Sequence, residues 1–427
     1  MYNLRGGFLL RPLIIALTLG FAGAMLSFLE ETFPGLGNLV PAALFPSHSD
    51  PQVAQVILSG IATSIMTVVS IVFAILLMTL TLASMQFSPR IIVSFAKDRV
   101  TQWTLGVFLG TFCYCMGALP TARSLPRPFS PVLTVFGAML LALACVAWLL
   151  YFIHHISHAI SVSHIVDRIA TETEGIIDDV MPHPRSSQPS FENEPREVET
   201  WNVPLLSEAS GYIRFIDTRR LVTLAKQHHV KIRAVRRVGQ FVPAGTPLVL
   251  VYKAARLSAE SGSEILGAFD LGPSRTLQQD IEFGVLQIVD IALKAISPAV
   301  NDPTTAVSCV DQLSRLLIRV VSRELPASVL YDPPGIPRVM IPWIDFEGLL
   351  NSAFQQIRLY SKSDIAVSLR LLRALSDVAW TSPDPALRRL LCAEGRRILE
   401  GCAEKLREEE LRPMRARLSA LEKLAAN

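Results

Sequence analysis

The sequence predicts a membrane protein of two parts: four transmembrane helices, then a cytoplasmic α+β domain with a small β barrel-sandwich-like module and a helical bundle. Three observations predict this fold class. The chain of 427 residues is 50% hydrophobic and only 18% charged, and its apolar runs lie in the first 156 residues. Residues 56–83 form a run without any charged side chain. This run is longer than the ~20 apolar residues that a spanning helix needs. Beyond residue 200, short alternating strands give way to helical periodicity.

We expect a transmembrane domain over residues 1–160, with its four spans at about residues 12–29, 53–83, 103–119 and 131–153. The loop before the second span has no Lys or Arg, whereas the loop after it carries Arg90, Lys97 and Arg99. Because basic residues near a span favour the cytoplasmic side, both termini are predicted to be cytoplasmic.

The second span carries a polar face. Small hydroxyl residues recur along it at three- and four-residue steps, with Ala74 and Leu77 filling the gap between Ser70 and Thr81, which places them on one side of a helix. These candidate pore-lining residues are Ser59, Thr63, Thr67, Ser70, Thr81 and Ser84. Such a face is typical of close packing between helices, and a wall along a pore or substrate path would have the same pattern. The neighbouring positions 62 and 65 are expected to face lipid.

The cytoplasmic part is predicted to have three sections. Residues 161–200 form a juxtamembrane helix and a linker rich in Pro, Ser and Glu. Residues 201–255 form the small β module, in which glycine turns and short strands resemble lipoyl-type domains. No lysine lies on a tight hairpin there, so a lipoyl or biotin carrier is not expected. Residues 256–427 form the helical section.

The most distinctive soluble segment runs from Ser297 to Ala306. Asp302 is suited to cap the next helix and Pro303 to occupy its first position. The alternative is that the exposed amides of this helix start capture an anionic ligand. We therefore name four candidate ligand-binding residues: Asn301, Asp302, Thr304 and Thr305.

Metal and cofactor sites are not predicted. His154 and His158 lie one turn apart, a spacing that can share a metal, but no carboxylate follows at ligand spacing. The six cysteines form no CxxC pair and are expected to be small buried residues.

A carboxylate cluster offers a weaker alternative. Asp280, Glu282 and Asp290 follow one another along a predicted helix without sharing one face, and Arg275 and Lys294 are available to pair with them. A metal site shared by these carboxylates is possible in principle, and simple ion pairing explains the same residues.

Several segments of the sequence are similar to a known protein family. The segments Leu82–Arg90, Asp98–Gln102 and Leu105–Thr111 resemble the membrane half of a bacterial family, domain of unknown function 2254. Val289–Ala306 is similar to the signature of its soluble half, and the match extends from the first span to about Leu317. The resemblance implies a multi-pass protein of the bacterial inner (plasma) membrane with four spans and a cytoplasmic domain. It implies no activity and no site residue.

Three functions remain open. The first is an oligomeric channel or transport-related protein with a cytoplasmic regulatory domain. The second is a membrane-anchored sensor or scaffold that binds a ligand or partner. The third is a membrane-bound enzyme of unrecognised type, which the absence of P-loop, GxSxG and HExxH motifs makes the least expected. The expected partners are the lipid bilayer and further copies of the chain in a homo-oligomer; a small ligand or ion is unknown. A net charge of +3 gives no reason to expect nucleic acid.

Overall fold

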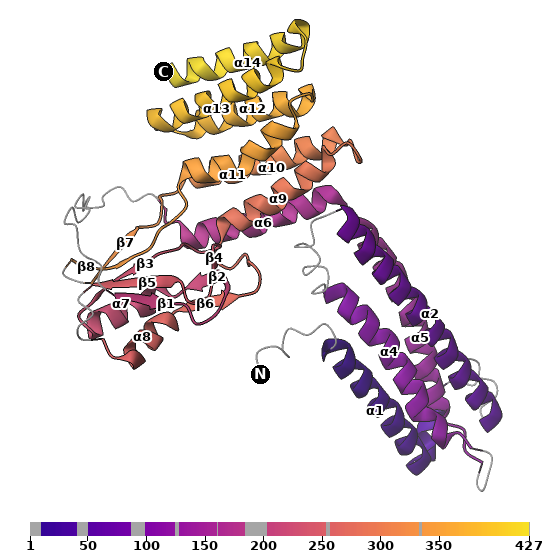
Figure 1. Cartoon of the computed structure of the whole chain (residues 1–427). Coiled ribbons are helices and arrows are strands. Elements are labelled where there is room, and N and C mark those ends of the chain that lie inside the picture. Colours follow the sequence, from indigo (N-terminus) through magenta and orange to yellow (C-terminus); the bar gives the residue numbers. More distant parts are fainter. Residues whose placement is uncertain are drawn as a thin grey trace. The chain divides into compact units, whose positions relative to one another are not determined.

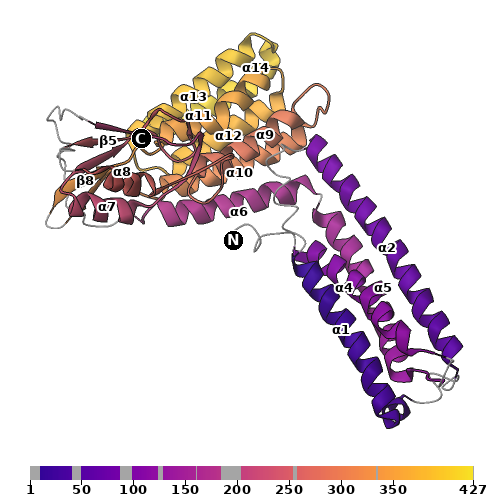
Figure 2. The same cartoon turned by 60° about the horizontal axis from the view of Figure 1, so that its bottom comes forward.

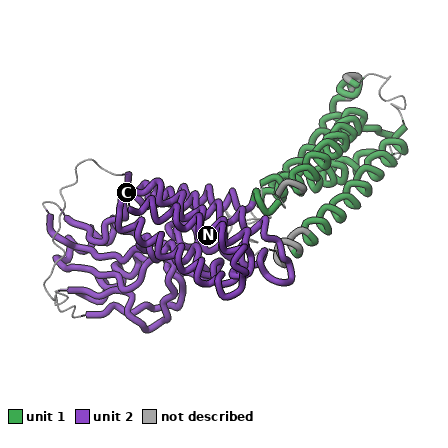
Figure 3. Tube along the Cα trace, turned by 90° about the horizontal axis from the view of Figure 1, so that it is seen from above, with its two compact units in different colours: residues 1–164 green, residues 165–427 purple. Residues whose placement is uncertain are grey.

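The computed structural model describes residues 10–40, 50–86, 99–123, 128–159, 161–183, 203–252, 257–332 and 335–426. The chain divides into two compact units, Met1–His164 and Ile165–Asn427 (Figure 3). The first is the membrane unit and the second the soluble unit in the following text.

The described part of the membrane unit contains four helices long and apolar enough to cross a membrane. These are α1 (Leu10–Thr32), α2 (Pro51–Gln86), α4 (Arg99–Ala118) and α5 (Val132–Ala159), with short 3-10 helices η1 (Pro34–Leu39) and η2 (Leu119–Thr121). α4 lies between α1 and α2 and contacts both (Figures 1 and 2). The four predicted spans are confirmed as candidate transmembrane helices.

Glycines allow α1 and α4 to approach each other closely. A Cβ atom at Gly23 would lie 2.4 Å from the carbonyl oxygen of Tyr114, and one at Gly117 would lie 2.6 Å from that of Gly20. Gly106 and Gly110 form a small-xxx-small pattern on the same face of α4, against Ile15 and Leu19 of α1. Between helices in lipid, close backbone contact of this kind replaces the hydrophobic driving force.

A carboxylate at the end of α1 caps the start of α5. Glu30 is buried, and its oxygens accept hydrogen bonds from the backbone N–H groups of Leu133 (2.8 Å) and Thr134 (3.1 Å) and from the Thr134 hydroxyl (3.0 Å). Its negative charge lies at the positive end of the α5 dipole. Arg123, which follows η2, forms an ion pair with the neighbouring Glu31 of α1.

Two sheets form the β part of the soluble unit. Its strands are β1 (Val203–Leu206), β2 (Gly211–Ile216), β3 (Lys231–Ala234), β4 (Phe241–Val242), β5 (Pro247–Tyr252), β6 (Phe269–Gly272), β7 (Val329–Asp332) and β8 (Ile336–Met340). One sheet has the order β1-β5-β3-β8-β7 and the other β4-β2-β6. Among the strands that the structure describes, the β3–β8 pairing is parallel and the others are antiparallel.

The first helix of the soluble unit is α6 (Val162–Val180), whose residues up to His164 belong to the membrane unit. The others are α7 (Thr218–Gln227), α8 (Ala259–Leu266), α9 (Ile281–Ala295), α10 (Pro303–Val321), α11 (Phe346–Tyr360), α12 (Ile365–Thr381), α13 (Pro385–Ala403) and α14 (Glu408–Ala426). α9 packs on α10 and α11, and the succession of helices continues through α12 to α14 (Figure 1).

Aspartate caps define where six of these helices begin. In each case the carboxylate accepts a hydrogen bond from a backbone N–H of the first turn, which satisfies a donor that has no partner inside the helix. The capping residues are Asp217, Asp280, Asp302, Asp345, Asp364 and Asp384.

The mixed helical and sheet composition of the soluble unit is confirmed, but the described strands form no closed barrel. The likeness to a barrel-sandwich therefore stays a prediction. β6, β7 and β8 come from residues after 255, so both sheets draw on more of the chain than the predicted module. Most of the predicted linker lies outside the described residues, and the boundaries at 160, 200 and 255 also stay predictions.

The glycine contacts between α1 and α4 make a testable prediction. Gly23→Ala should destabilise the membrane unit by about 1–3 kcal/mol, the usual cost of overpacking, because the new methyl group meets backbone that cannot rotate away. The measurement is thermal unfolding of the full chain in detergent. Gly60→Ala on α2 is the control, since nothing lies within 4 Å of its added Cβ. Equal stability of the two variants would contradict the close α1–α4 approach.

Candidate functional site

The hydroxyl face of α2, consisting of Ser59, Thr63, Thr67, Ser70 and Thr81, is exposed on the described chain. The side chain of Ser84, the sixth predicted member, lies outside the described residues. The opposite side of α2 is buried against α4 and α5 and consists of Ala54, Leu58, Ala62, Ile65 and Val72. The structure thus brings these hydroxyls onto one face but leaves that face without cover from its own bundle.

The prediction that positions 62 and 65 face lipid is wrong. Ala62 and Ile65 are 4% and 6% exposed, and they pack in the apolar clusters that join α2 to α4 and α5. A helix with one polar side has several apolar positions left over, and periodicity alone does not say which of them contacts the bundle.

Hydroxyls on the exposed face are bonded within their own helix. Thr67 donates to the carbonyl oxygen of Thr63 (3.0 Å), Ser70 to that of Met66 (3.0 Å) and Thr81 to that of Leu77 (2.8 Å). This bonding satisfies each donor without a neighbouring helix. The hydroxyl oxygens keep lone pairs that can accept from water or from another polar group. The face is therefore compatible with lipid and with water.

The candidate ligand-binding segment forms the turn between α9 and α10. Asp302 accepts from the backbone N–H of Thr305 (3.1 Å) and from its hydroxyl (2.6 Å), so both carboxylate oxygens are engaged. These hydrogen bonds hold the pKa of Asp302 below its usual value. Asn301 has φ of 50°, a left-handed conformation that asparagine tolerates. Thr304 is exposed. The four predicted residues lie together, and the contacts of Asp302 are those of a helix cap.

Replacement of the cap tests this assignment. Asp302→Ala should lower the free energy of unfolding of the soluble unit by about 0.5–2 kcal/mol, because one backbone donor of α10 loses its acceptor. Thr304→Ala is the matched control and should be nearly neutral. Chemical denaturation of the full chain, with hydrogen exchange in α10, measures the difference. Unchanged stability together with loss of a ligand response would show that the segment is a binding site instead.

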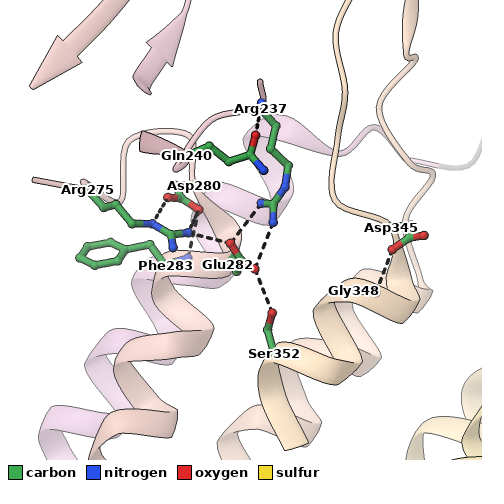
Figure 4. A network of polar contacts seen from close by, with 9 residues as sticks. All are labelled: Arg237, Gln240, Arg275, Asp280, Glu282, Phe283, Asp345, Gly348 and Ser352. Atoms are coloured by element: carbon green, nitrogen blue, oxygen red, sulfur yellow. Dashed lines mark hydrogen bonds and ion pairs between the residues drawn. The ribbon is translucent and has the colours of Figure 1, made fainter. Parts of the chain in front are cut away.

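A buried charged network lies where the β part of the soluble unit meets its helices (Figure 4). Glu282 of α9 accepts two hydrogen bonds from Arg237, each 3.1 Å, one from Arg275 (2.9 Å) and one from Ser352 of α11 (2.9 Å). Arg275 also forms a bidentate pair with Asp280, at 2.7 and 2.8 Å. This set of five residues is the charged network in the following text.

Sequence reasoning had paired Arg275 with Asp280 and Glu282, and the structure confirms that pairing. It missed Arg237 and Ser352, which come from segments 45 and 70 residues away from Glu282. The one local signal for Arg237 is its position before Gly239, whose φ of 85° marks a tight turn. A Cβ at Gly239 would lie 2.2 Å from an oxygen of Asp280, so only glycine lets this turn reach the network.

The network has two positive and two negative side chains and is closed to further chemistry. Burial disfavours the charged form of Glu282, but Arg237, Ser352 and Arg275 outweigh it and hold its pKa below the usual value. Burial lowers the pKa of Arg275, and its contacts with Asp280 and Glu282 raise it by more. Glu282 is therefore ionised and hydrogen-bonded at neutral pH. A group in this state is a poor general base, and it positions secondary structure instead.

A small cavity of about 20 Å³ adjoins the network, lined in part by Arg237, Asp280, Glu282 and Trp343. This volume holds about one water molecule. The indole N–H of Trp343 has no hydrogen-bond partner among the described residues, so a water in this cavity would satisfy it. The cavity is too small for a substrate.

Neither the histidines nor the cysteines form a metal site in the described part of the chain, where no group of three His, Cys, Asp or Glu side chains can hold a metal ion. His154 belongs to α5, and the side chain of His158 lies outside the described residues. All six cysteines are free thiols, and five are buried. Burial raises the pKa of Cys309 to about 12, so this thiol is inert at neutral pH.

Comparison with known proteins agrees with this picture. The model of the family described as predicted membrane protein, DUF2254, matches residues 5–377. The chain belongs to this family. Two relatives, the uncharacterised proteins Rv1290c of Mycobacterium tuberculosis and Mb1321c of Mycobacterium bovis, are 34% identical over 380 residues, which is 88% of this chain and 72% of theirs. No solved structure matches the chain. DUF2254 thus identifies a membrane protein without assigning it an activity.

The charged network predicts a pH-dependent stability. Glu282→Gln should destabilise the soluble unit by up to about 3 kcal/mol at neutral pH, the lower end of the cost of breaking a buried pair, since two partly buried arginines lose a shared partner. Because the folded pKa lies below the ordinary value of 4.5, the contribution of Glu282 is present above that pH and disappears as the pH falls through the folded pKa. The wild type and the variant should therefore converge in acid.

Denaturant unfolding of the full chain across a pH series measures this effect. Glu404→Gln is the control, because its ion pair with Lys362 is exposed and should contribute little. A deficit for Glu282→Gln that is the same at all pH values, or no larger than that of the control, would contradict the ionised network.

Proposed function

We propose that the protein is an oligomeric channel or transport-related protein of the bacterial inner membrane, with both termini in the cytoplasm. The path is lined by the hydroxyl face of α2 from several copies, and the cytoplasmic domain regulates it. The supporting observation is the position of that face, which is exposed on the side of α2 opposite its packing contacts.

Several copies are needed because one bundle has no room for a path. The buried side of α2 packs against α4 and α5 through residues that include Leu58, Ile65 and Phe108. A pocket of about 430 Å³ between α2 and α5 is lined by apolar side chains alone and by none of the α2 hydroxyls. A packed bundle of this kind leaves no continuous central opening. Copies arranged with their α2 hydroxyl faces inward would instead enclose a path of small, uncharged polar side chains. Such a path offers water hydrogen-bond partners and carries no charge of its own to select by sign.

The second candidate is a membrane-anchored sensor or scaffold. It is favoured by the intrahelical hydrogen bonds of Thr67, Ser70 and Thr81, because a hydroxyl bonded to its own helix does not need water. In that case the hydroxyl face packs against lipid or another helix, and function belongs to the soluble unit. The two candidates differ in one property, the access of water to α2.

Water access is measured by placing single cysteines on α2. Ser59→Cys, Thr63→Cys, Thr67→Cys and Ser70→Cys should react with a small, charged, water-soluble thiol reagent in native membranes, because the proposed path is wet. Native cysteines need no removal, since only Cys113 is not buried and the parent chain supplies the background.

Phe21→Cys on α1 and Leu143→Cys on α5 are the controls for this experiment. Both side chains are well exposed on membrane-spanning helices, and neither lies on α2. They should react at least tenfold more slowly, because a thiolate does not form in hydrocarbon. Equal silence at all six positions would exclude the path and leave the sensor or scaffold.

A further inference from the structure

α6 is the element that connects the last span to the soluble unit. It begins at Val162, and only residues 160 and 161 separate it from the end of α5 at Ala159. One side of α6 is buried and consists of Ile165, Val166, Ile169, Ala170, Thr173, Ile176 and Ile177. A Cβ at Gly284 of α9 would lie 2.0 Å from the hydroxyl oxygen of Thr173. α6 therefore packs on α9, and the two helices come close where Thr173 meets Gly284.

Charged residues at the edge of this contact form a ladder between α6 and α10. On α10 and just after it, Arg315, Arg319 and Arg323 follow one another at four-residue steps. Arg315 binds Glu174 at 2.5 and 2.9 Å and Asp167 at 2.9 Å.

The remaining two arginines share one acid. Arg319 forms a bidentate pair with Asp178 at 2.6 and 2.8 Å, and Arg323 reaches the same carboxylate at 2.5 Å. The hydrogen bond from Arg319 is the main reason that the pKa of Asp178 lies below its usual value. These six residues are the α6–α10 ladder in the following text.

The three arginines of the ladder differ in exposure, whereas Asp178, which two of them share, is 36% exposed. The Arg323 side chain is 3% exposed, whereas the side chains of Arg315 and Arg319 are 38% and 40% exposed. Salt screens exposed pairs strongly and buried pairs much less. A single exposed pair changes an equilibrium by at most about fivefold. The exposed pairs of Arg315 and Arg319 therefore cannot detach α6 from the apolar contacts of its buried side. Together they can change the stability of its packing.

We propose that the α6–α10 ladder is a clasp sensitive to ionic strength, through which the soluble unit regulates the path along α2. This inference rests on the proposed function and adds its regulation. α6 follows α5 after two residues in the sequence, and α5 packs against α2, so the proposal requires that a change in how α6 is held reaches α5 through this connection. The buried side of α6 keeps this helix attached while the exposed pairs respond to salt.

The experiment uses the full chain carrying Thr67→Cys in vesicles, with the labelling rate as the readout of the path. Rates are compared between about 0.05 M and about 0.5 M salt, a range over which the screening length falls about threefold, at constant osmolarity. Asp167→Asn combined with Glu174→Gln removes the two carboxylates that pair with Arg315. Arg319→Gln removes the exposed pair of Arg319 with Asp178. Asp178 stays in place in both variants, so Arg323 keeps its partner and folding is preserved.

Arg373→Gln is the matched control, because its exposed pair with Asp377 lies within α12 and does not touch α6. Hydrogen exchange of residues 165–180 in the same samples reports how firmly α6 is held. In the wild type and the control, salt should change the labelling rate by about threefold or more and should weaken the protection of α6. Both ladder variants should show the high-salt behaviour already at low salt, with little further response.

Two results would overturn the proposal, and they are distinguishable. Labelling that occurs but responds to salt equally in all variants would exclude the clasp and leave the path intact. Protection of α6 that is the same at both salt concentrations would exclude the clasp in the same way. Labelling at no salt concentration would exclude the proposed path, and the regulation would fall with it.

Discussion

The absence of water inside a bilayer is the constraint on which this structure depends. Every polar group in the spans must find a partner in the protein or in a wet path. At the end of α1, the carboxylate of Glu30 meets this requirement by capping α5. Along α2, Thr67 and Ser70 meet it through their own helix. The difference between the two is exposure: Glu30 is buried in the bundle, and the α2 hydroxyls face outward. The outward position makes them available to a second copy or to water.

In the soluble unit, charged side chains join elements that are distant in the sequence. Glu282 joins a β turn, through Arg237, to α9 and to Ser352 of α11. Asp178 joins α6 to α10 by the same chemistry. A carboxylate shared by two arginines fixes geometry, and where it is shielded from water, as Glu282 is, removal of either partner leaves an unpaired charge. These ion pairs therefore hold elements that are distant in the sequence in fixed positions within the soluble unit.

Much of the fold was predictable because it follows from local pattern. Long uncharged runs gave the four spans, and the sequence Asn301-Asp302-Pro303 identified the start of α10 from capping chemistry alone. Contacts between distant segments were not predictable. The approach of Gly23 to Tyr114 depends on which faces of α1 and α4 meet, and the meeting of Arg237 with Glu282 depends on the sheet topology. α2 illustrates both kinds of feature. Periodicity predicted that the hydroxyls share one face, but only the packing of the bundle shows that Ala62 and Ile65 are buried.

The central claim is that the hydroxyl faces of α2 from neighbouring copies converge on a wet path. A structure of the assembled protein in lipid nanodiscs tests it most directly, through the position of Thr67 relative to its counterparts in other copies. We expect an oligomer in which Thr67 of each copy faces a common axis, with ordered water between the copies. A monomer, or an oligomer in which Thr67 contacts acyl chains on the outside while another surface forms the interface, would contradict it.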